Sequence, residues 1–107
     1  MTEMCTLTVG PEDTACLSGA LTLETVAGLY RDMEKRLPGA GPILRVDLAG
    51  VSAADSAGLA LLLEWQARHR GRGRALTITN APDSLLKLAK LSEAIELLNI
   101  SGRGEQA

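Results

Sequence analysis

The chain has 107 residues, of which 46% are hydrophobic and only 2% aromatic, so its core must be built from aliphatic side chains. This length provides for one hydrophobic core and is too short for two, which predicts one domain over residues 1–107 with a core of about 4–100 and a polar tail at 101–107. The net charge of −2, spread over interspersed charges, excludes the broad basic surface that nucleic-acid binding requires.

The cysteine content and the N-terminal sequence indicate a cytoplasmic protein. Cys5 and Cys16 are isolated, and no basic start followed by an apolar run marks the chain for export. No apolar run approaches the roughly 20 residues needed to span a bilayer. We therefore expect no direct membrane insertion, and any membrane association would depend on a partner.

The first part of the chain has the pattern of a β-hairpin followed by an amphipathic helix. Met4–Val9 and Thr14–Ser18 are short extended runs separated by turn-forming residues. Apolar residues then recur at helical spacing over residues 23–37, with charged residues on the other face. Thr22 fits the N-cap of this helix, and Pro38 ends it.

The second part alternates strands and helices. Ile43–Leu48 predicts a central strand, and the helical crossover before it favours parallel pairing. A turn of small residues then leads into a helix over about residues 57–70, and residues 75–79 form another strand. Pro82 suits the first turn of a third helix, and Ser92 is expected to cap a final short helix. The order β-β-α-β-α-β-α-α predicts an α/β fold with a mixed, mostly parallel four-stranded sheet and flanking helices.

Asp55 and Ser56 stand directly before the second predicted helix, where several backbone N–H groups have no partner within the helix. Either side chain can accept hydrogen bonds from these groups, and capping alone is a sufficient reason for both residues. In a second interpretation, Ser56 is a regulatory hydroxyl. A phosphate there would add about −1.5 to −2 charges beside the helix start and the Asp55 carboxylate, which would affect partner binding more than folding.

Catalysis by Ser56 has little support in the sequence. His69, the single histidine, falls near the far end of the same predicted helix, about 20 Å from Ser56, and cannot act as its base. We interpret His69 as a solvated helix-end residue. Two isolated cysteines and one histidine do not form a zinc site, so no catalytic residue, metal or cofactor is expected. An enzyme with Ser56 as its nucleophile is the weaker alternative.

The second predicted helix contains leucines on more than one side. Leu59, Leu62 and Leu63 share the face expected to contact the sheet, whereas Leu61 and Trp65 point away from it. Two interpretations of this second pair are open. Trp65 is either an exposed anchor for a partner, a role in which tryptophan is enriched, or it is covered by the last helices.

The residues around Ser56 carry a family resemblance. Val46-Asp47-Leu48, Val51 and Asp55-Ser56-Ala57-Gly58-Leu59 resemble the signature of STAS domains, the family of sulfate transporter tails and anti-sigma factor antagonists. The resemblance covers nearly the whole chain and implies a SpoIIAA-like fold. Within the family, residues 55–63 and Leu88-Ala89-Lys90-Leu91 are most similar to the small cytoplasmic subunit of bacterial Mla phospholipid ABC transporters.

The resemblance implies a non-enzymatic accessory subunit that binds the ATP-binding subunit of a phospholipid ABC transporter and supports outer-membrane lipid asymmetry. The alternative that it implies is an anti-sigma factor antagonist, in which an anti-sigma factor kinase phosphorylates Ser56. The Mla subunits have threonine at the position of Ser56, so the choice between these partners stays open. The residues expected to bind the partner are Asp55, Ser56, Ala57, Gly58, Leu61 and Trp65.

Overall fold

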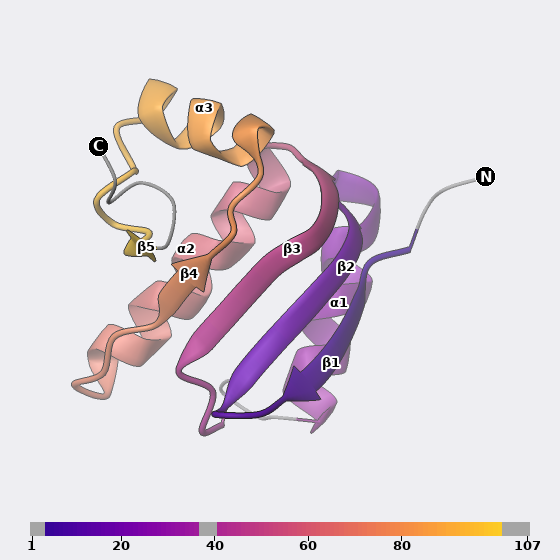
Figure 1. The fold of residues 1–107 in the computed structure, drawn as a ribbon, viewed down its shortest axis with the longest axis vertical. Coiled ribbons are helices and arrows are strands. Elements are labelled where there is room, and N and C mark those ends of the chain that lie inside the picture. Colours follow the sequence, from indigo (N-terminus) through magenta and orange to yellow (C-terminus); the bar gives the residue numbers. More distant parts are fainter. Residues whose placement is uncertain (1–3, 37–40, 102–107) are drawn as a thin grey trace.

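A β-sheet with helices packed on one face forms the protein. The computed structural model describes residues 4–36 and 41–101, and over these residues the sheet has five strands in the order β1-β2-β3-β4-β5 (Figure 1). The elements are β1 Thr6–Gly10, β2 Thr14–Leu21, α1 Leu23–Arg36, β3 Arg45–Ala54, α2 Ser56–Gly71, β4 Thr77–Thr79, α3 Asp83–Leu91 and β5 Ile100–Ser101.

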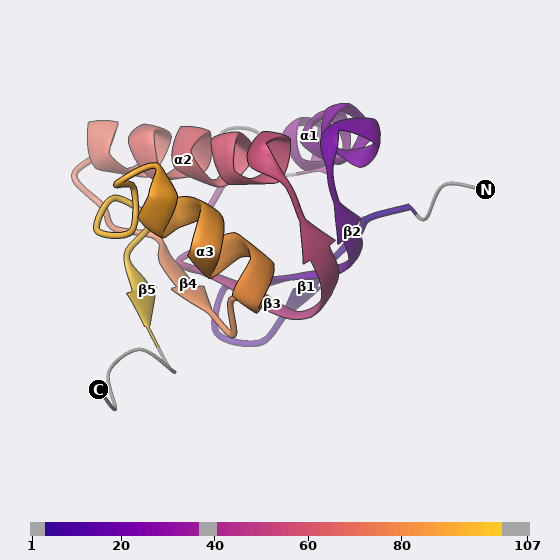
Figure 2. The ribbon, with the colours of Figure 1, turned by 90° about the horizontal axis from the view of Figure 1, so that it is seen from above.

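Strand pairing confirms the expected α/β class. β1 pairs antiparallel with β2, and the β2–β3, β3–β4 and β4–β5 pairs are all parallel. Right-handed crossovers place α1 and α2 side by side on the same face of the sheet, as Figure 2 shows. α3 lies near the β4 side and contacts both β3 and α2. The opposite face of the sheet is covered by none of the described helices (Figure 1).

The expected hairpin and first helix are present, and the predicted stop at Pro38 lies outside the described residues. β3 is longer than predicted, because the small residues expected to form a turn stay paired with β2 as far as Ala54. Two register shifts in this pairing each add residues to β3. A Cβ at Gly50 would lie 3.1 Å from the carbonyl oxygen of Leu17, so the strands approach closely there.

The final helix expected from Ser92 does not form. Residues 92–99 make turns, and Glu93 and Asn99 have φ of 56° and 55°, a left-handed conformation that ends helical geometry. The chain then adds β5, a two-residue strand beside β4 that the sequence pattern did not reveal.

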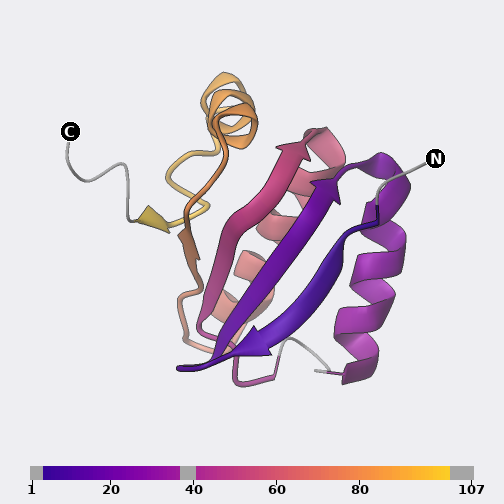
Figure 3. The same cartoon turned by 45° about the vertical axis from the view of Figure 1, so that its right-hand side comes forward.

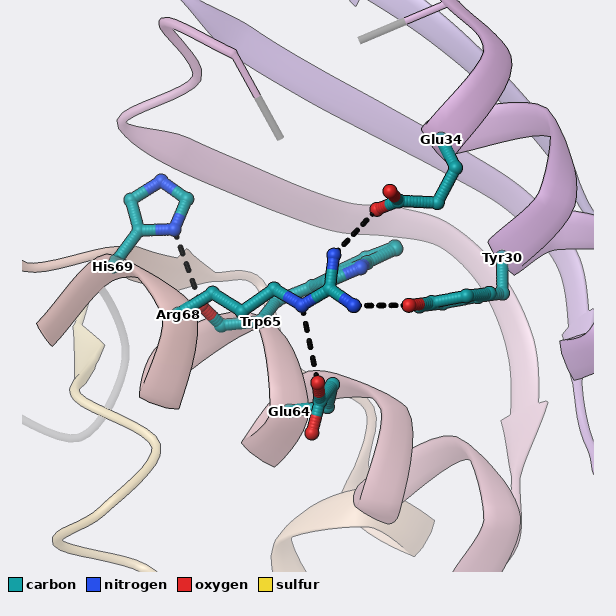
Figure 4. Close-up of polar contacts among 6 residues, drawn as sticks. All are labelled: Tyr30, Glu34, Glu64, Trp65, Arg68 and His69. Atoms are coloured by element: carbon teal, nitrogen blue, oxygen red, sulfur yellow. Dashed lines mark hydrogen bonds and ion pairs between the residues drawn. The ribbon is translucent and has the colours of Figure 1, made fainter. Parts of the chain in front are cut away.

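Trp65 is fully buried and Leu61 is 5% exposed, so the interpretation of this pair as an exposed anchor is wrong. α1 lies against this side of α2 and covers it. Arg68, one turn after Trp65, is ion-paired to Glu34 of α1 (2.6 Å) and donates a hydrogen bond to the hydroxyl of Tyr30 (Figure 4). The largest fully buried apolar side chains, aliphatic except for Trp65, are Leu17, Leu21, Leu29, Met33, Ile43, Leu48, Leu62, Trp65, Leu76, Ile78, Leu85 and Leu98.

Two polar residues of α2 are buried and bind backbone groups of neighbouring segments. His69 is not solvated as expected: it is fully buried, with Nε2 2.6 Å from the carbonyl oxygen of Ile43 and Nδ1 3.1 Å from that of Trp65. The Gln66 amide nitrogen donates to the carbonyl oxygens of Leu76 and Leu98, and its amide oxygen accepts from the N–H of Leu76. These contacts attach α2 to the segments before β3, β4 and β5.

Replacing Gln66 with leucine keeps the volume but removes three buried hydrogen bonds, those to the carbonyl oxygens of Leu76 and Leu98 and that from the N–H of Leu76, and only the Leu76 carbonyl keeps another donor, the Asn99 amide. We expect Gln66→Leu to lower the free energy of unfolding by about 2–4 kcal/mol, measured by urea denaturation. Ala67→Leu, at the exposed neighbouring position, is the control and should change stability little. A loss of less than about 1 kcal/mol for Gln66→Leu would show that this network contributes little to the fold.

Candidate protein-binding site

The candidate site is built around Asp55, which lies between the end of β3 and the start of α2. Its Oδ1 accepts hydrogen bonds from the N–H groups of Ala57 (2.9 Å) and Gly58 (3.2 Å), so Asp55 is the N-cap of α2. Its Oδ2 accepts from the N–H of Leu23, the first residue of α1, at 3.0 Å. One carboxylate therefore caps two helices that start 33 residues apart in the sequence.

These hydrogen bonds keep Asp55 ionised. Its pKa is lowered from the ordinary value, chiefly because the Leu23 N–H donates to it, with smaller contributions from Gly58 and Ala57. Partial desolvation acts in the opposite direction and is outweighed. The negative charge lies where the positive ends of two helix dipoles meet, which stabilises both helix starts.

Gly58 lies in the protein interior, packed against the end of β2. A Cβ at Gly58 would lie 2.4 Å from the carbonyl oxygen of Leu21, so only glycine lets the first turn of α2 rest against the end of β2. Gly58, Leu61 and Trp65 are all buried. The prediction that these three residues contact a partner is therefore wrong, because the packing of α2 against β2 and α1 encloses them.

Ser56 is the first residue of α2, and its side chain is exposed. The sequence did not distinguish which of Asp55 and Ser56 caps the helix. In the structure, the hydrogen bonds to the first-turn N–H groups of α2 come from Asp55. The Ser56 hydroxyl is thus on the surface at the helix start, with half-buried Ala57 beside it.

Leu23 is a surface residue that the sequence pattern misplaced. Its periodicity assigned it to the core face of α1, yet it is 76% exposed, because the buried face of α1 is formed by Thr25, Leu29 and Met33 and Leu23 lies outside that stripe. One feature of the sequence did point to the exposure of Leu23, namely its position directly after the N-cap candidate Thr22. We call Leu23, Asp55, Ser56 and Ala57 the helix-start surface.

This surface combines an apolar side chain, a hydroxyl and a fixed carboxylate, which suits protein binding rather than catalysis. Both nitrogens of His69 face backbone carbonyl oxygens in the interior, so His69 provides no base for Ser56. Among residues 4–36 and 41–101, no three His, Cys, Asp or Glu side chains are grouped to hold a metal ion. None of the helices described here is long and apolar enough to cross a membrane.

Comparison with solved structures defines the class of fold. A Thermotoga maritima protein assigned as an anti-sigma factor antagonist superimposes with a TM-score of 0.72 at 11% identity, covering 95% of this chain and 89% of that one. The anti-sigma factor antagonist SpoIIAA, in its unphosphorylated form, gives a TM-score of 0.59 at 17% identity, covering 86% and 94%. The protein therefore has a SpoIIAA-like STAS fold.

Sequence comparison defines the family within that class. The family model described as the MlaB STAS domain matches residues 10–99. The intermembrane phospholipid transport system binding protein MlaB of Escherichia coli K12 is 35% identical over 79 residues, which are 74% of this chain and 78% of MlaB. MlaB of Shigella flexneri matches equally. The chain belongs to the MlaB-type STAS domain family.

The charge of Asp55 makes stability depend on pH in a defined direction. Because the folded-state pKa lies below the unfolded one, ionised Asp55 stabilises the fold above about pH 4, and this contribution declines as pH falls through the folded-state pKa. We expect Asp55→Asn to lower the free energy of unfolding by about 1 kcal/mol at pH 7 and by less at pH 3, measured by urea denaturation. Glu96→Gln is the exposed control, and an Asp55→Asn effect that does not vary with pH would contradict the role assigned to the charge.

Proposed function

We propose that this protein is a non-enzymatic accessory subunit of an intermembrane phospholipid transport system and that its helix-start surface binds the ATP-binding subunit. The family membership and the name of its MlaB relatives support the transport system. The observation that carries the proposed surface is the shared cap: Asp55 holds exposed Leu23 and exposed Ser56 at the starts of two adjacent helices. In this proposal the protein lies at the cytoplasmic side of the inner membrane through its partner.

The helix-start surface is suited to a stable protein contact because its parts are already ordered. Leu23 offers an apolar side chain, and its backbone is fixed by the hydrogen bond to Asp55. A rigid surface binds with a smaller loss of conformational entropy than a flexible loop does. Ser56 adds a hydroxyl next to the leucine, so a negative charge placed there would be buried against the partner without compensation.

A negative charge at either exposed residue should prevent binding. We expect Ser56→Glu and Leu23→Glu each to reduce affinity for the co-expressed ATP-binding subunit at least about 100-fold, since charge burial costs several kcal/mol. Helix starts tolerate glutamate, so both variants should stay folded by circular dichroism. Ala75→Glu adds the same charge at an exposed position in the segment that follows α2, and it should bind like the wild type. Unchanged binding by both Ser56→Glu and Leu23→Glu would reject the surface.

The second candidate function is a partner-switching regulator. Its specific support is that Ser56 is exposed while Asp55 caps α2, so a phosphate on the hydroxyl would leave the existing cap in place. The similarity to SpoIIAA in fold agrees with this candidate but does not distinguish it from the transporter subunit.

Phosphorylation distinguishes the two functions. The protein is incubated with ATP and an anti-sigma factor kinase that modifies SpoIIAA in the same buffer, and its intact mass is measured. For the transporter subunit we expect no added mass. One phosphate in the wild type and none in Ser56→Ala would establish the regulator instead.

A further inference from the structure

β3 extends well beyond its pairing with β4. β4 is three residues long and pairs with β3 at Arg45, Val46 and Asp47, so within the described structure the rest of β3, up to Ala54, has no partner in β4. Figure 3 shows β3 continuing past the end of β4, while the chain that leads to α3 turns away from it. On its other edge, β3 stays paired with β2 as far as Ala54.

The two segments separate at Asn80, the residue after β4. Asn80 has φ of 56°, a left-handed conformation, and its side-chain amide donates to Oδ1 of Asp47 at 2.9 Å. A groove of about 460 Å³ then lies between β3 and the chain leading to α3, lined by three residues of β3 and by Asn80, Ala81 and Pro82. The strand pairing that fixes the first part of β3 on this edge therefore does not reach its last part.

α3 contacts β3 again at the last residue of the strand. The N–H of Ala54, which is buried, donates to the hydroxyl oxygen of Ser84 at 3.2 Å. The next N–H along the chain, that of Asp55, donates to the carbonyl oxygen of Leu21 at 3.2 Å. Two consecutive N–H groups thus hold the end of β3, one through α3 and the other through β2.

The Ser84 hydroxyl serves β3 rather than its own helix. Serine near a helix start commonly accepts hydrogen bonds from first-turn N–H groups of the same helix. Ser84 is the second residue of α3, whose N-cap, Pro82, makes no side-chain hydrogen bond. Its oxygen accepts instead from Ala54, 30 residues earlier in the sequence. The hydroxyl therefore has its structural role outside α3, next to Asp55.

The position of Ala54 affects the shared cap directly. Asp55 follows Ala54 in the chain, and its carboxylate has to reach the N–H of Leu23 at 3.0 Å and that of Ala57 at 2.9 Å. Such bonds require heavy-atom distances of about 3 Å and weaken steeply when the angle is poor. A displacement of the strand end would therefore weaken the cap of at least one helix.

We propose that Ser84 is a positioning residue of the helix-start surface: by holding the end of β3 through the Ala54 N–H, it keeps Asp55 within reach of both helix starts and fixes Ser56 for partner binding. The effect on Asp55 depends on the fold alone, and the effect on the partner rests on the proposed function. α3 thereby influences a surface to which it contributes no residue.

The first test measures the geometry at Asp55 in the isolated protein. Ser84→Ala removes the hydroxyl and introduces a strong helix former, so the variant should stay folded by circular dichroism. The pKa of Asp55, followed by NMR of its carboxyl carbon, should rise toward the ordinary value, because the N–H groups of the two helix starts then donate to it less well. Ser84→Thr keeps the hydroxyl and should titrate like the wild type. Ser92→Ala, which removes an exposed serine at the other end of α3, is the matched control.

The second test measures partner binding. The affinity of Ser84→Ala for the purified ATP-binding subunit, measured by biolayer interferometry, should fall about 5-fold, the factor expected from the loss of one neutral hydrogen bond. Ser84→Thr and Ser92→Ala should bind like the wild type. In the wild type, the Ala54 amide should be protected from hydrogen exchange, and fast exchange there would contradict its hydrogen bond to Ser84.

The outcomes separate the role of Ser84 from the proposed function. An unchanged Asp55 pKa in Ser84→Ala, or an equal rise in Ser84→Thr, would overturn the proposal. A raised pKa with wild-type affinity would overturn the effect on partner binding. Loss of binding in Ser56→Glu would then leave the proposed function standing, whereas wild-type binding in both Ser56→Glu and Leu23→Glu would reject that function as well.

Discussion

The hydrogen bonds of one carboxylate organise the functional end of this protein. β2 and β3 are parallel, so the helices that follow them start at the same edge of the sheet. Asp55 accepts from the N–H of Leu23 with one oxygen and from those of Ala57 and Gly58 with the other. The helix starts would otherwise expose unpaired donors to solvent, and their dipoles would repel each other. A single side chain satisfies both requirements and leaves Ser56 free on the surface.

Much of the architecture could be predicted because it depends on local signals. The hairpin, the amphipathic α1 and the parallel crossovers follow from turn residues, periodicity and connection length. β5 could not be predicted, because a two-residue strand has no pattern of its own and forms where β4 offers an edge. The length of β3 likewise depends on its pairing with β2, which no window of sequence reveals.

The errors at individual residues have a common physical origin. α2 is covered by the sheet and by α1, so its buried residues form one broad stripe at spacings of three and four residues, wider than the face of Leu59, Leu62 and Leu63 expected to contact the sheet, and Trp65 looked exposed. Arg68 reinforced that impression, since its ion pair with Glu34 forms only after α1 and α2 come together. His69 and Gln66 are polar yet buried, because backbone carbonyl oxygens of distant segments supply their partners. Residue type alone does not show where such partners will lie.

The register shifts in β3 have a consequence for the position of the binding surface. Buried residues along the strand are Val46, Leu48, Val51 and Ala54, so the simple two-residue alternation is interrupted twice. Each interruption resets which face the following residues occupy, and Asp55 comes directly after the second. Deleting one residue from residues 49–53 would turn the last part of the strand over and direct the carboxylate away from α1. The number of residues in β3, more than the identity of the surface residues, thus decides whether the Asp55 carboxylate can cap both α1 and α2.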